Sequence, residues 1–461
     1  MIGTPDGLTI KARPFTHRES GTDEPTWLLD SRWDTVPGLG LDAILRRYPH
    51  VVLVAPHPDD ETLALGGTLA DLAQTAESVT VVIATHGGSG PGSTVRRTEA
   101  EQALTALGAH ITSMWWDLAD GSLQDEIGVM VERLGEFVDD RTLLLAPVEC
   151  DGHCDHEAVA VSAETVARER GAALLEYPVW LWHWATPDDV DWARVRTIAP
   201  SLRALTAKSA AIDCYTSQLA SPDGHPVVGT ALLTRARRVM ETVLTPLPHD
   251  LAARVTDHTA TVRSRAHIAA PFDAMLPDDV TDPWRLDASE YERRRLALTL
   301  ACLGRPHYRS VLEIGCATGQ LSAQLRQRAD SVIGMDASEM ALKVARARTE
   351  AVDWLLGAAP ADIPVADFDL IVLSEIAYFL TGPELLATLR AVRRQLRPGG
   401  EILIANWSAP TENIPLDGPT VHDQATAVFD LPLRARYHDA DLVIQVWGQP
   451  ISVFREYADV R

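Results

Sequence analysis

The sequence predicts an α/β protein with two doubly wound domains in tandem, each built on a mainly parallel sheet flanked by helices. Three observations lead to this fold class. The chain has 461 residues, which is too long for one ordinary domain. Two apolar segments, 51–55 and 310–315, lie far apart in the chain, and each runs into a turn. After each of them, short apolar segments alternate with helical patterns, which is typical of parallel strands buried on both faces.

The first domain is expected to alternate strands and helices from residue 51 onward. Small and apolar residues at helical spacing follow the first strand, and a second apolar segment follows them. The predicted elements are a strand over 51–55, a helix over 63–76, a strand over 79–84, helices over 95–107 and 125–139, and a strand over 143–147.

The second domain is expected to repeat this alternation. Its predicted elements are a strand over 310–315, a helix over 321–329, a strand over 332–336, a helix over 340–348, and strands over 369–375 and 401–405. Between the two domains, residues 263–290 are rich in Pro and Asp, which indicates a linker or a lid. We therefore assign 1–262 to the first domain with an N-terminal extension, 263–290 to the linker or lid, and 291–461 to the second domain.

Composition narrows the classes of partner. Hydrophobic residues make up 46% and charged residues 23% of the chain, as in well-packed globular proteins. The net charge of −23 has the wrong sign for binding a nucleic-acid backbone. No apolar segment reaches membrane-spanning length, the N-terminus lacks a signal pattern, and five cysteines are too few for a disulfide framework. We expect a cytoplasmic protein with a small-molecule substrate and no nucleic-acid or membrane partner.

Histidines and carboxylates follow two predicted strands of the first domain. His57, Asp59 and Asp60 come directly after the first strand, and Asp151-Gly-His153-Cys-Asp155-His156 follows the strand over 143–147. Parallel sheets place functional groups at the carboxyl ends of their strands. Hydrolytic zinc takes three ligands from His and carboxylate and leaves one position for water, and a free carboxylate beside it can accept a proton. The sequence therefore predicts a catalytic metal site, and the alternative is a solvated acidic loop.

These residues resemble the PIG-L type N-acetylglucosaminyl deacetylases, whose signature is Pro/Ala-His-Pro-Asp-Asp-Glu with a later His-x-Asp-His. The resemblance covers roughly residues 48–225. It includes Arg96-x-x-Glu99, Asp120-Gly121, and Lys208 with Ser217-Gln218, in the order of the family. This chain has Asp151 where some relatives have an aromatic residue ahead of the second motif.

The resemblance implies a role for each matching residue. The expected ligands of zinc, or of another divalent metal, are His57, Asp60 and His156. Asp59 would be the general base, and His153 would be a charged donor to the oxyanion or to the leaving amine.

Three further residues of the first domain have implied roles around this centre. Asp155 would orient a ligand imidazole. Arg96 and Asp120 would contact the substrate.

Other residues near this site have simpler interpretations. Trp180, Trp182 and Trp184 alternate, so we expect them on one face of a strand, where core packing is the first interpretation and a sugar-stacking platform the second. Cys150 and Cys154 could be mistaken for a metal pair, but the His/Asp set already completes a site.

The second domain opens with a glycine turn, Glu313-x-Gly315-x-Ala317-x-Gly319. Asp336 ends the next predicted strand, at a spacing that suits a carboxylate on the ribose hydroxyls. A dinucleotide fold would have glycine at the position of Ala317, so that the backbone can approach a pyrophosphate. The pattern favours a cationic nucleoside ligand without phosphate.

This pattern looks like the class I S-adenosylmethionine-dependent methyltransferases. The resemblance implies that Glu313, Gly315, Gly319 and Asp336 bind the cofactor. Ala358 stands where the family often has an acidic residue near the adenine amino group. Two Rossmann-like domains would then lie on one chain.

More narrowly, the second domain resembles the nodulation-type N-methyltransferases over roughly residues 272–405. The matching motifs are Asp282-Pro-Trp284, Tyr291-Glu-Arg293 and Ser374-Glu-Ile-Ala-Tyr378. These enzymes methylate the free amine of a deacetylated glucosamine unit. Glu375 and Tyr378 would orient such an amine and collect its proton. His422 could cap the pocket, but a surface-loop position is the preferred interpretation.

The two resemblances fit one reaction sequence. Removing an N-acetyl group leaves a primary amine, which the second type of enzyme methylates. The resulting hypothesis is a bifunctional N-deacetylase and N-methyltransferase for an N-acetylated amino sugar, with fusion raising the local concentration of the intermediate. Two alternatives remain open: a methyltransferase with an unrelated hydroxyl or carboxylate acceptor, and a regulatory domain that binds S-adenosylmethionine without catalysis.

Overall fold

The computed structural model describes residues 15–88, 91–220, 224–247, 255, 263–276, 282–409 and 414–451. The chain divides into two compact units, Met1–Thr261 and Val262–Arg461. The stretch 1–14, on which the expected lack of a signal pattern rests, lies outside the described residues, as do residues 277–281 of the expected linker.

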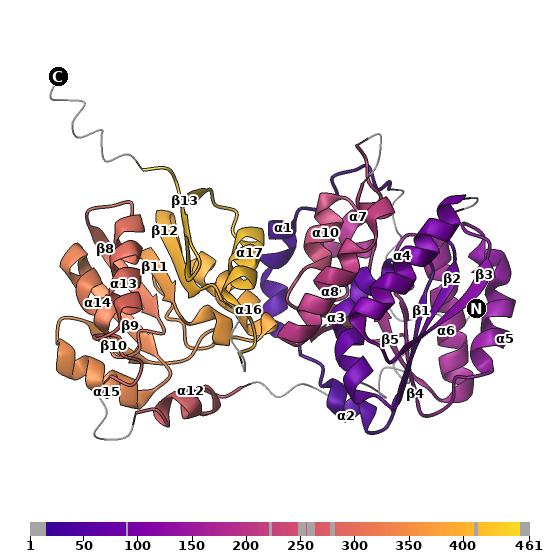
Figure 1. Ribbon diagram of the computed structural model, residues 1–461, viewed down its shortest axis with the longest axis horizontal. Helices are drawn as coiled ribbons and strands as arrows, with labels where there is room; N and C mark the ends of the chain where they lie inside the picture. The colour runs from indigo at the N-terminus through magenta and orange to yellow at the C-terminus, as the bar shows by residue number, and fades with distance from the viewer. Residues whose placement is uncertain are drawn as a thin grey trace, which may run out of the picture. The chain divides into compact units, whose positions relative to one another are not determined.

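The first unit is built on a sheet of seven strands (Figure 1). The strands are β1 (His50–Ala55), β2 (Ser78–Thr85), β3 (Ile111–Leu118), β4 (Thr142–Pro147), β5 (Ala173–Tyr177), β6 (Val195–Ile198) and β7 (Glu241–Leu244). Their order is β3-β2-β1-β4-β5-β7-β6. The first five run parallel, whereas β7 is antiparallel to both β5 and β6.

Helices cover both faces of this sheet. Alternate side chains of β1 enter different cores: Val51 and Leu53 pack with α3, α4 and α8, whereas Val52 and Val54 pack with α5 and α6. The helices are α1 (Glu24–Leu28), α2 (Leu41–Leu45), α3 (Asp60–Thr75), α4 (Pro91–Leu107), α5 (Ile127–Gly135), α6 (Cys154–Arg170), α7 (Leu181–Trp184), α8 (Leu202–Asp213), α9 (Thr216–Leu219) and α10 (Thr230–Ala236).

The second unit contains another seven-stranded sheet. Its strands are β8 (Tyr308–Ile314), β9 (Ala329–Asp336), β10 (Asp353–Leu356), β11 (Phe368–Ser374), β12 (Leu396–Trp407), β13 (Leu433–His438) and β14 (Leu442–Trp447). The helices are α12 (Arg265–Asp273), α13 (Glu290–Cys302), α14 (Gln320–Leu325), α15 (Glu339–Arg348), α16 (Gly382–Gln395) and α17 (Gly418–Val428). α13 and α14 share a core with β8 and β11, and α16 and α17 pack against β12.

Both sheets have the same topology. The order β10-β9-β8-β11-β12-β14-β13 repeats that of the first unit strand for strand, including an antiparallel seventh strand. In each unit the strand order reverses between the first and fourth strands, which lie side by side in the sheet. Doubly wound sheets bind ligands at this point. The predicted fold class is confirmed. None of the described helices is long and apolar enough to cross a membrane.

Some local predictions were wrong. Residues 181–184 form the short helix α7 rather than a strand, since β5 already ends at Tyr177. The helix expected over 125–139 begins with a 3-10 turn and ends at Gly135. The strand expected over 401–405 extends back to Leu396, with an irregularity where it meets β11. Helix α12 lies within the stretch assigned to a linker or lid.

Candidate functional site

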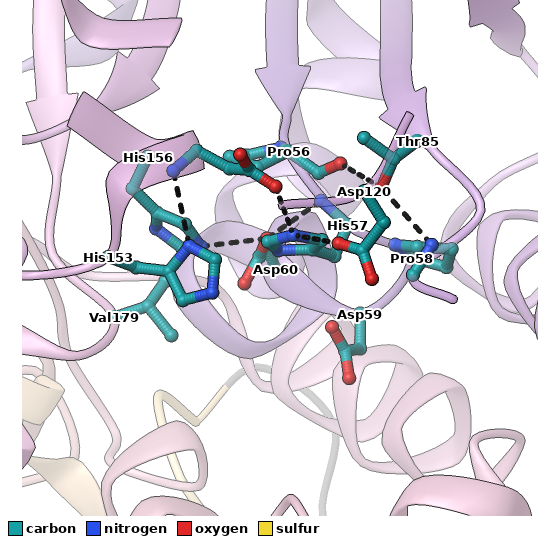
Figure 2. A network of polar contacts seen from close by, with 12 residues as sticks. Pro56, His57, Pro58, Asp59, Asp60, Thr85, Asp120, His153, His156 and Val179 are labelled. Atoms are coloured by element: carbon teal, nitrogen blue, oxygen red, sulfur yellow. Dashed lines mark hydrogen bonds and ion pairs between the residues drawn. The ribbon is translucent and has the colours of Figure 1, made fainter. Parts of the chain in front are cut away.

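The histidines and carboxylates of the first unit meet at the ends of β1 and β4. His57 follows β1, and His153 caps the N-terminus of α6, where its Nδ1 accepts a hydrogen bond from the Asp155 amide at 3.3 Å. Figure 2 shows the side chains of His57, Asp60, His153 and His156 gathered in one cluster, with Asp59 to one side. The structure thus brings together both motifs, which are far apart in the chain.

The three expected metal ligands converge. Oδ2 of Asp60 lies 3.3 Å from Nδ1 of His57 and 3.3 Å from Nε2 of His156. His156 is fully buried, and among the described residues neither of its ring nitrogens has a hydrogen-bond partner of good geometry. Two imidazoles and a carboxylate with an unsatisfied buried nitrogen suit a divalent transition metal. The ring nitrogens of His57, His153 and His156 also lie within 4.8 Å of one another, which is a second possible set.

Further carboxylates hold the ligand imidazoles from behind. Nε2 of His57 lies 3.1 Å from Asp155 and 3.0 Å from Asp120. Nδ1 of His156 lies 2.7 Å from Asp151, which is fully buried. Carboxylates in this position fix the tautomer and orientation of a ligand histidine. The orienting position of Asp155 agrees with the sequence-based expectation.

Asp151 is a functional residue that the sequence analysis missed. Its carboxylate accepts hydrogen bonds from the backbone amides of Val179, Trp180 and Leu181, at 2.9–3.0 Å, besides facing His156. These amides lie at the start of α7, so one side chain ties this segment to the metal centre. The sequence offered one signal for this role, which is the position of Asp151 just ahead of the His-x-Asp-His motif.

The carboxylates set the charge of the cluster. Burial disfavours charge on His57 and His156, but the facing carboxylates outweigh it: Asp120, Asp155 and Asp60 raise the pKa of His57, and Asp60 with Asp151 raises that of His156 to about 9. For Asp60 burial acts in the opposite direction, yet His156 and His57 lower its pKa. The cluster is therefore a closely compensated set of opposite charges.

Asp59 stands at the N-terminus of α3 in a strained backbone conformation, with φ of 121°. Its amide donates to Glu61 at 3.1 Å, and Arg96 reaches its Oδ2 at 3.3 Å. Burial raises the pKa of Asp59 to about 7, although Arg96 acts to lower it. A carboxylate poised near neutral pH is suited to accept and return a proton.

His153 differs from the expected charged donor. Burial, together with His156 and His57, lowers its pKa to about 4. Because Nδ1 accepts the Asp155 amide, the proton of the neutral ring lies on Nε2. The surroundings thus favour a neutral hydrogen-bond donor over a charged one.

The cavity at this centre has a polar and an apolar wall. Asp59, Arg96 and Asp120 line it beside the histidines, so the two expected substrate contacts face the same space. The apolar wall consists of Leu63, Val179, Trp180, Val227, Val228 and Leu232.

The tryptophans and cysteines nearby play different parts. Trp180 borders the cavity, whereas Trp182 packs edge-on against Trp27 in the core. Cys150 is largely buried and Cys154 is exposed, and neither belongs to a potential ligand group among the described residues.

The second unit contains the expected glycine turn at the end of β8. Gly315, Ala317 and Gly319 have φ of 74°, 48° and 83°. A Cβ on Gly315 would lie only 2.7 Å from Ile376, so glycine is required there. Asp336 accepts hydrogen bonds from the amides of Ala317 and Ser338, both at 2.9 Å, and burial raises its pKa.

A cavity of about 230 Å³ lies against this turn. Three of the four expected cofactor residues, Glu313, Gly315 and Asp336, line this cavity. The fourth, Gly319, lies behind the turn against Trp354. Burial raises the pKa of Glu313 to about 8, against the hydrogen bond that Ser322 donates to it. The buried carboxylates and the apolar lining suit a nucleoside ligand with a positive charge.

The far end of this cavity is built around Glu375. Glu375 directly follows β11 with φ of 58° and accepts hydrogen bonds from the hydroxyls of Tyr378 at 2.6 Å and Tyr291 at 3.2 Å. Burial raises the pKa of Glu375, although Arg295 acts to lower it. Arg295 is itself held by Glu292 at 2.9 Å and by Ser374. The sequence analysis missed the contacts of Tyr291 and Arg295, which come from α13.

Two other sequence expectations concern this pocket. His422 is buried in α17, where its Nδ1 lies 2.9 Å from Gln445, and it is absent from the pocket wall. It is therefore neither a cap nor an exposed loop residue. The backbone amide of Ala358 donates to the carboxylate of Asp362 at 2.9 Å. Where the family often has an acidic residue near adenine, this chain therefore has backbone and the nearby Asp362.

Family models match each unit. The model described as GlcNAc-PI de-N-acetylase matches residues 52–167, and that of nodulation protein S matches residues 275–413. Nodulation protein S of Rhizobium tropici is 29% identical over 130 residues, which is 27% of this chain and 55% of the relative. The Bradyrhizobium diazoefficiens protein is 30% identical over 132 residues, 28% of this chain and 63% of its own length. The chain thus spans less than two thirds of these relatives.

Solved structures resemble each unit as well. The N-methyltransferase NodS of Bradyrhizobium japonicum in complex with S-adenosyl-l-homocysteine is 24% identical, covers 40% of this chain and 98% of its own, and has a TM-score of 0.36. The A40926 pseudoaglycone deacetylase Dbv21 is 24% identical, covers 43% and 97%, and has a TM-score of 0.35. On the family matches, the chain joins a PIG-L-type deacetylase domain to a NodS-type, S-adenosylmethionine-dependent methyltransferase domain.

Proposed function

We propose that the chain is a bifunctional enzyme that hydrolyses the N-acetyl group of an N-acetylated amino sugar and then methylates the freed amine. One observation supports deacetylation followed by methylation of the same nitrogen. The site with the general base Asp59 would release a primary amine, and the second pocket presents a partly buried carboxylate, Glu375, bracketed by two tyrosine hydroxyls. A carboxylate in that setting suits recognition of an amine.

In the first reaction, His57, Asp60 and His156 would hold a divalent cation, which supplies Lewis-acid polarisation when bound. Asp59 accepts a proton from the attacking water and returns it to the leaving nitrogen as the C–N bond breaks. The Nε2–H of His153 donates to the oxygen on which negative charge develops. Arg96 holds Asp59 in place, and Asp120 contacts the sugar.

In the second reaction, Glu313, Gly315, Gly319 and Asp336 would hold S-adenosylmethionine, which supplies an electrophilic methyl group. Glu375 orients the neutral amine by accepting its N–H and then collects the proton released on transfer. Tyr378 and Tyr291 keep the carboxylate fixed, and burial raises the pKa of Glu375, which favours its acceptance of a proton.

Product mass spectrometry tests this proposal. N-acetylhexosamine compounds are incubated with the protein, with and without isotopically labelled S-adenosylmethionine, alongside an Asp59→Asn variant. We expect loss of acetyl without cofactor, and a methyl gain on the same molecule only when Asp59 is intact. Methylation of compounds that still carry the acetyl group would contradict the proposal, because the methyl would then go to an oxygen or to another site.

A further inference from the structure

The cavity of the second unit has four carboxylates and one cation in its wall. The carboxylates are Glu292, Glu313, Asp336 and Glu375, and the cation is Arg295 on α13. No other Lys, Arg or His side chain of the described residues lines this cavity. S-adenosylmethionine carries two positive groups, the sulfonium and the α-ammonium, and one negative group, the α-carboxylate. The four expected cofactor residues are acidic residues and glycines, so none of their side chains can neutralise that carboxylate.

The order of the strands gives the direction in which the cofactor extends. β10, β9, β8 and β11 are parallel neighbours, so their carboxyl ends follow one another along one edge of the sheet. Ala358, at the expected adenine position, follows β10, and Asp336, expected on the ribose, ends β9. The sulfonium and the amino-acid group would then extend past β8 toward β11. Arg295 lies at this end of the cavity, because its Nη1 contacts the hydroxyl of Ser374, the last residue of β11.

The guanidinium of Arg295 is held in place and still has donors to offer. Its Nε and Nη2 donate to Oε2 of Glu292 at 2.9 and 2.5 Å, and its Nη1 donates to the hydroxyl of Ser374. A guanidinium has five N–H groups, so one N–H on each terminal nitrogen is left without a partner among the described residues. The terminal nitrogens of arginine match the two oxygens of a carboxylate. Arg295 is only 6% exposed, so bulk water competes little for these donors.

We propose that Arg295 pairs with the α-carboxylate of S-adenosylmethionine and that Glu292 keeps the guanidinium in place. Arg295 is then the residue that distinguishes a ligand with an α-carboxylate from one without it. The pairing concerns the cofactor alone, so it does not depend on which acceptor is methylated or on the deacetylation.

Calorimetric titration with two ligands tests this pairing. The full chain is titrated, without a methyl acceptor, with S-adenosylmethionine and with decarboxylated S-adenosylmethionine, which lacks only the carboxylate. We expect the wild type to bind the complete cofactor about tenfold more tightly or better, because the other ligand cannot form the charge-assisted pair. In Arg295→Met this preference should vanish or reverse, since the decarboxylated ligand has the larger positive charge and the carboxylates of the wall remain.

Two further variants make the comparison specific. Arg294→Met removes the neighbouring arginine of α13, whose exposed side chain pairs with Asp439, and it should keep the wild-type preference. Arg295→Lys keeps the charge but loses the planar set of donors, so it should retain only part of the preference.

Three results would overturn the proposal. Equal or tighter binding of the decarboxylated ligand by the wild type would show that no cation meets the carboxylate, and this test holds even if Arg295→Met fails to fold. A preference that persists in Arg295→Met would place the carboxylate elsewhere, for example at Gln320 in the same wall. An equal loss of affinity for both ligands in Arg295→Met would leave Arg295 a structural role only.

The same titration separates this pairing from the proposed function. If the preference depends on Arg295 but the wild type methylates no amino sugar, the proposed function fails and the carboxylate site stands. If the wild type methylates an amino sugar but binds both ligands equally, the proposed function stands and the role of Arg295 fails.

Discussion

At the scale of single residues, each site depends on one carboxylate held in an unusual state. Asp59 is buried and Glu375 partly buried, both have a positive φ, and both follow the end of a central strand. Backbone strain of this kind persists only where surrounding contacts hold it, and here those contacts are Glu61 for Asp59 and two tyrosines for Glu375. This supports a direct chemical role for each carboxylate.

Asp59→Asn should lower deacetylation by about 100-fold or more, because the amide cannot accept the proton of the attacking water. Metal content, measured by elemental analysis, should stay unchanged, since the expected ligands are intact. The exposed Asp42→Asn serves as the control and should retain full activity. Loss of metal in Asp59→Asn would instead make Asp59 a ligand.

Asp151→Asn should weaken metal binding by about 10- to 100-fold, because His156 loses the carboxylate that orients it. Competition with a chelator measures this affinity. An unchanged affinity combined with a lower unfolding temperature would contradict this role and leave Asp151 as a tie to the amides of residues 179–181 alone.

Glu375→Gln should lower kcat of methyl transfer by about 100-fold or more, with little change in the affinity for S-adenosylmethionine. Glutamine keeps the hydrogen bonds of one oxygen but cannot take the amine proton. Single-turnover rates with a glucosamine acceptor, together with cofactor titration, separate the two effects. An equal loss of cofactor affinity would place Glu375 in cofactor binding instead.

At the scale of elements, strand ends decide where the groups gather. The turns after β1 and β4 carry the His/Asp cluster, and the turns after β8, β9 and β11 line the cavity of the second unit. Helices bring the remaining contacts: α13 places Tyr291 and Arg295 beside Glu375, and α12 places Ile268 and Phe272 in the pocket wall. The stretch assigned to a linker or lid thus contributes to the cofactor pocket.

The carboxylates at the ends of β8 and β9 predict the pH dependence of cofactor binding. Burial raises the pKa of Glu313 to about 8 and also that of Asp336, so both bind protons more readily than in the unfolded chain. Their protonated forms stabilise unit 2 at low pH, and that contribution is lost as the pH rises toward 8. A cation prefers the ionised forms, so S-adenosylmethionine should bind more tightly at pH 8.5 than at pH 6.5, with release of protons.

Calorimetry in buffers of different ionisation enthalpy measures the affinity for S-adenosylmethionine and the number of protons released on binding. Glu313→Gln should flatten the pH dependence, because the group with the pKa near 8 is removed. Affinity that falls as the pH rises would contradict this account of the pocket charge.

At the scale of the whole molecule, two units with one topology carry two different sets of site residues. The strand order is the same in both sheets, and both sites lie between the first and fourth strands of their sheet. What differs is the turn after the first strand: a His-Pro-Asp-Asp segment in one unit and a glycine turn in the other. Function is thus set by the residues at the switch point and not by the fold.

Mixing two single variants should restore the complete product. Asp59→Asn retains the methyltransferase and Glu375→Gln retains the deacetylase, so an amine released by one protein can be methylated by the other. Mass spectrometry of the mixture should show the deacetylated, methylated compound, whereas the double variant should yield none. A mixture without product would contradict release of the intermediate.

The fold class and the two chemical motifs could be predicted from the amino-acid sequence alone. Apolar segments that end in His-Pro-Asp-Asp or in a glycine turn identify parallel strands, and the ends of such strands meet at one edge. His57, Asp60 and His156 could therefore be predicted to converge, and so could Gly315 and Asp336. These predictions need only the order of the strands and their local pattern.

Which side chains complete the sites depends on the packing of the elements in three dimensions. Asp151 faces His156 and Tyr291 reaches Glu375 through contacts between elements distant in the chain. Spacing in the sequence carries no information on such contacts, because they depend on how helices pack on the sheet. The alternating tryptophans show the same limit. Their period of two predicted a strand, but residues 181–184 form the helical turn α7, whose first amide donates to Asp151.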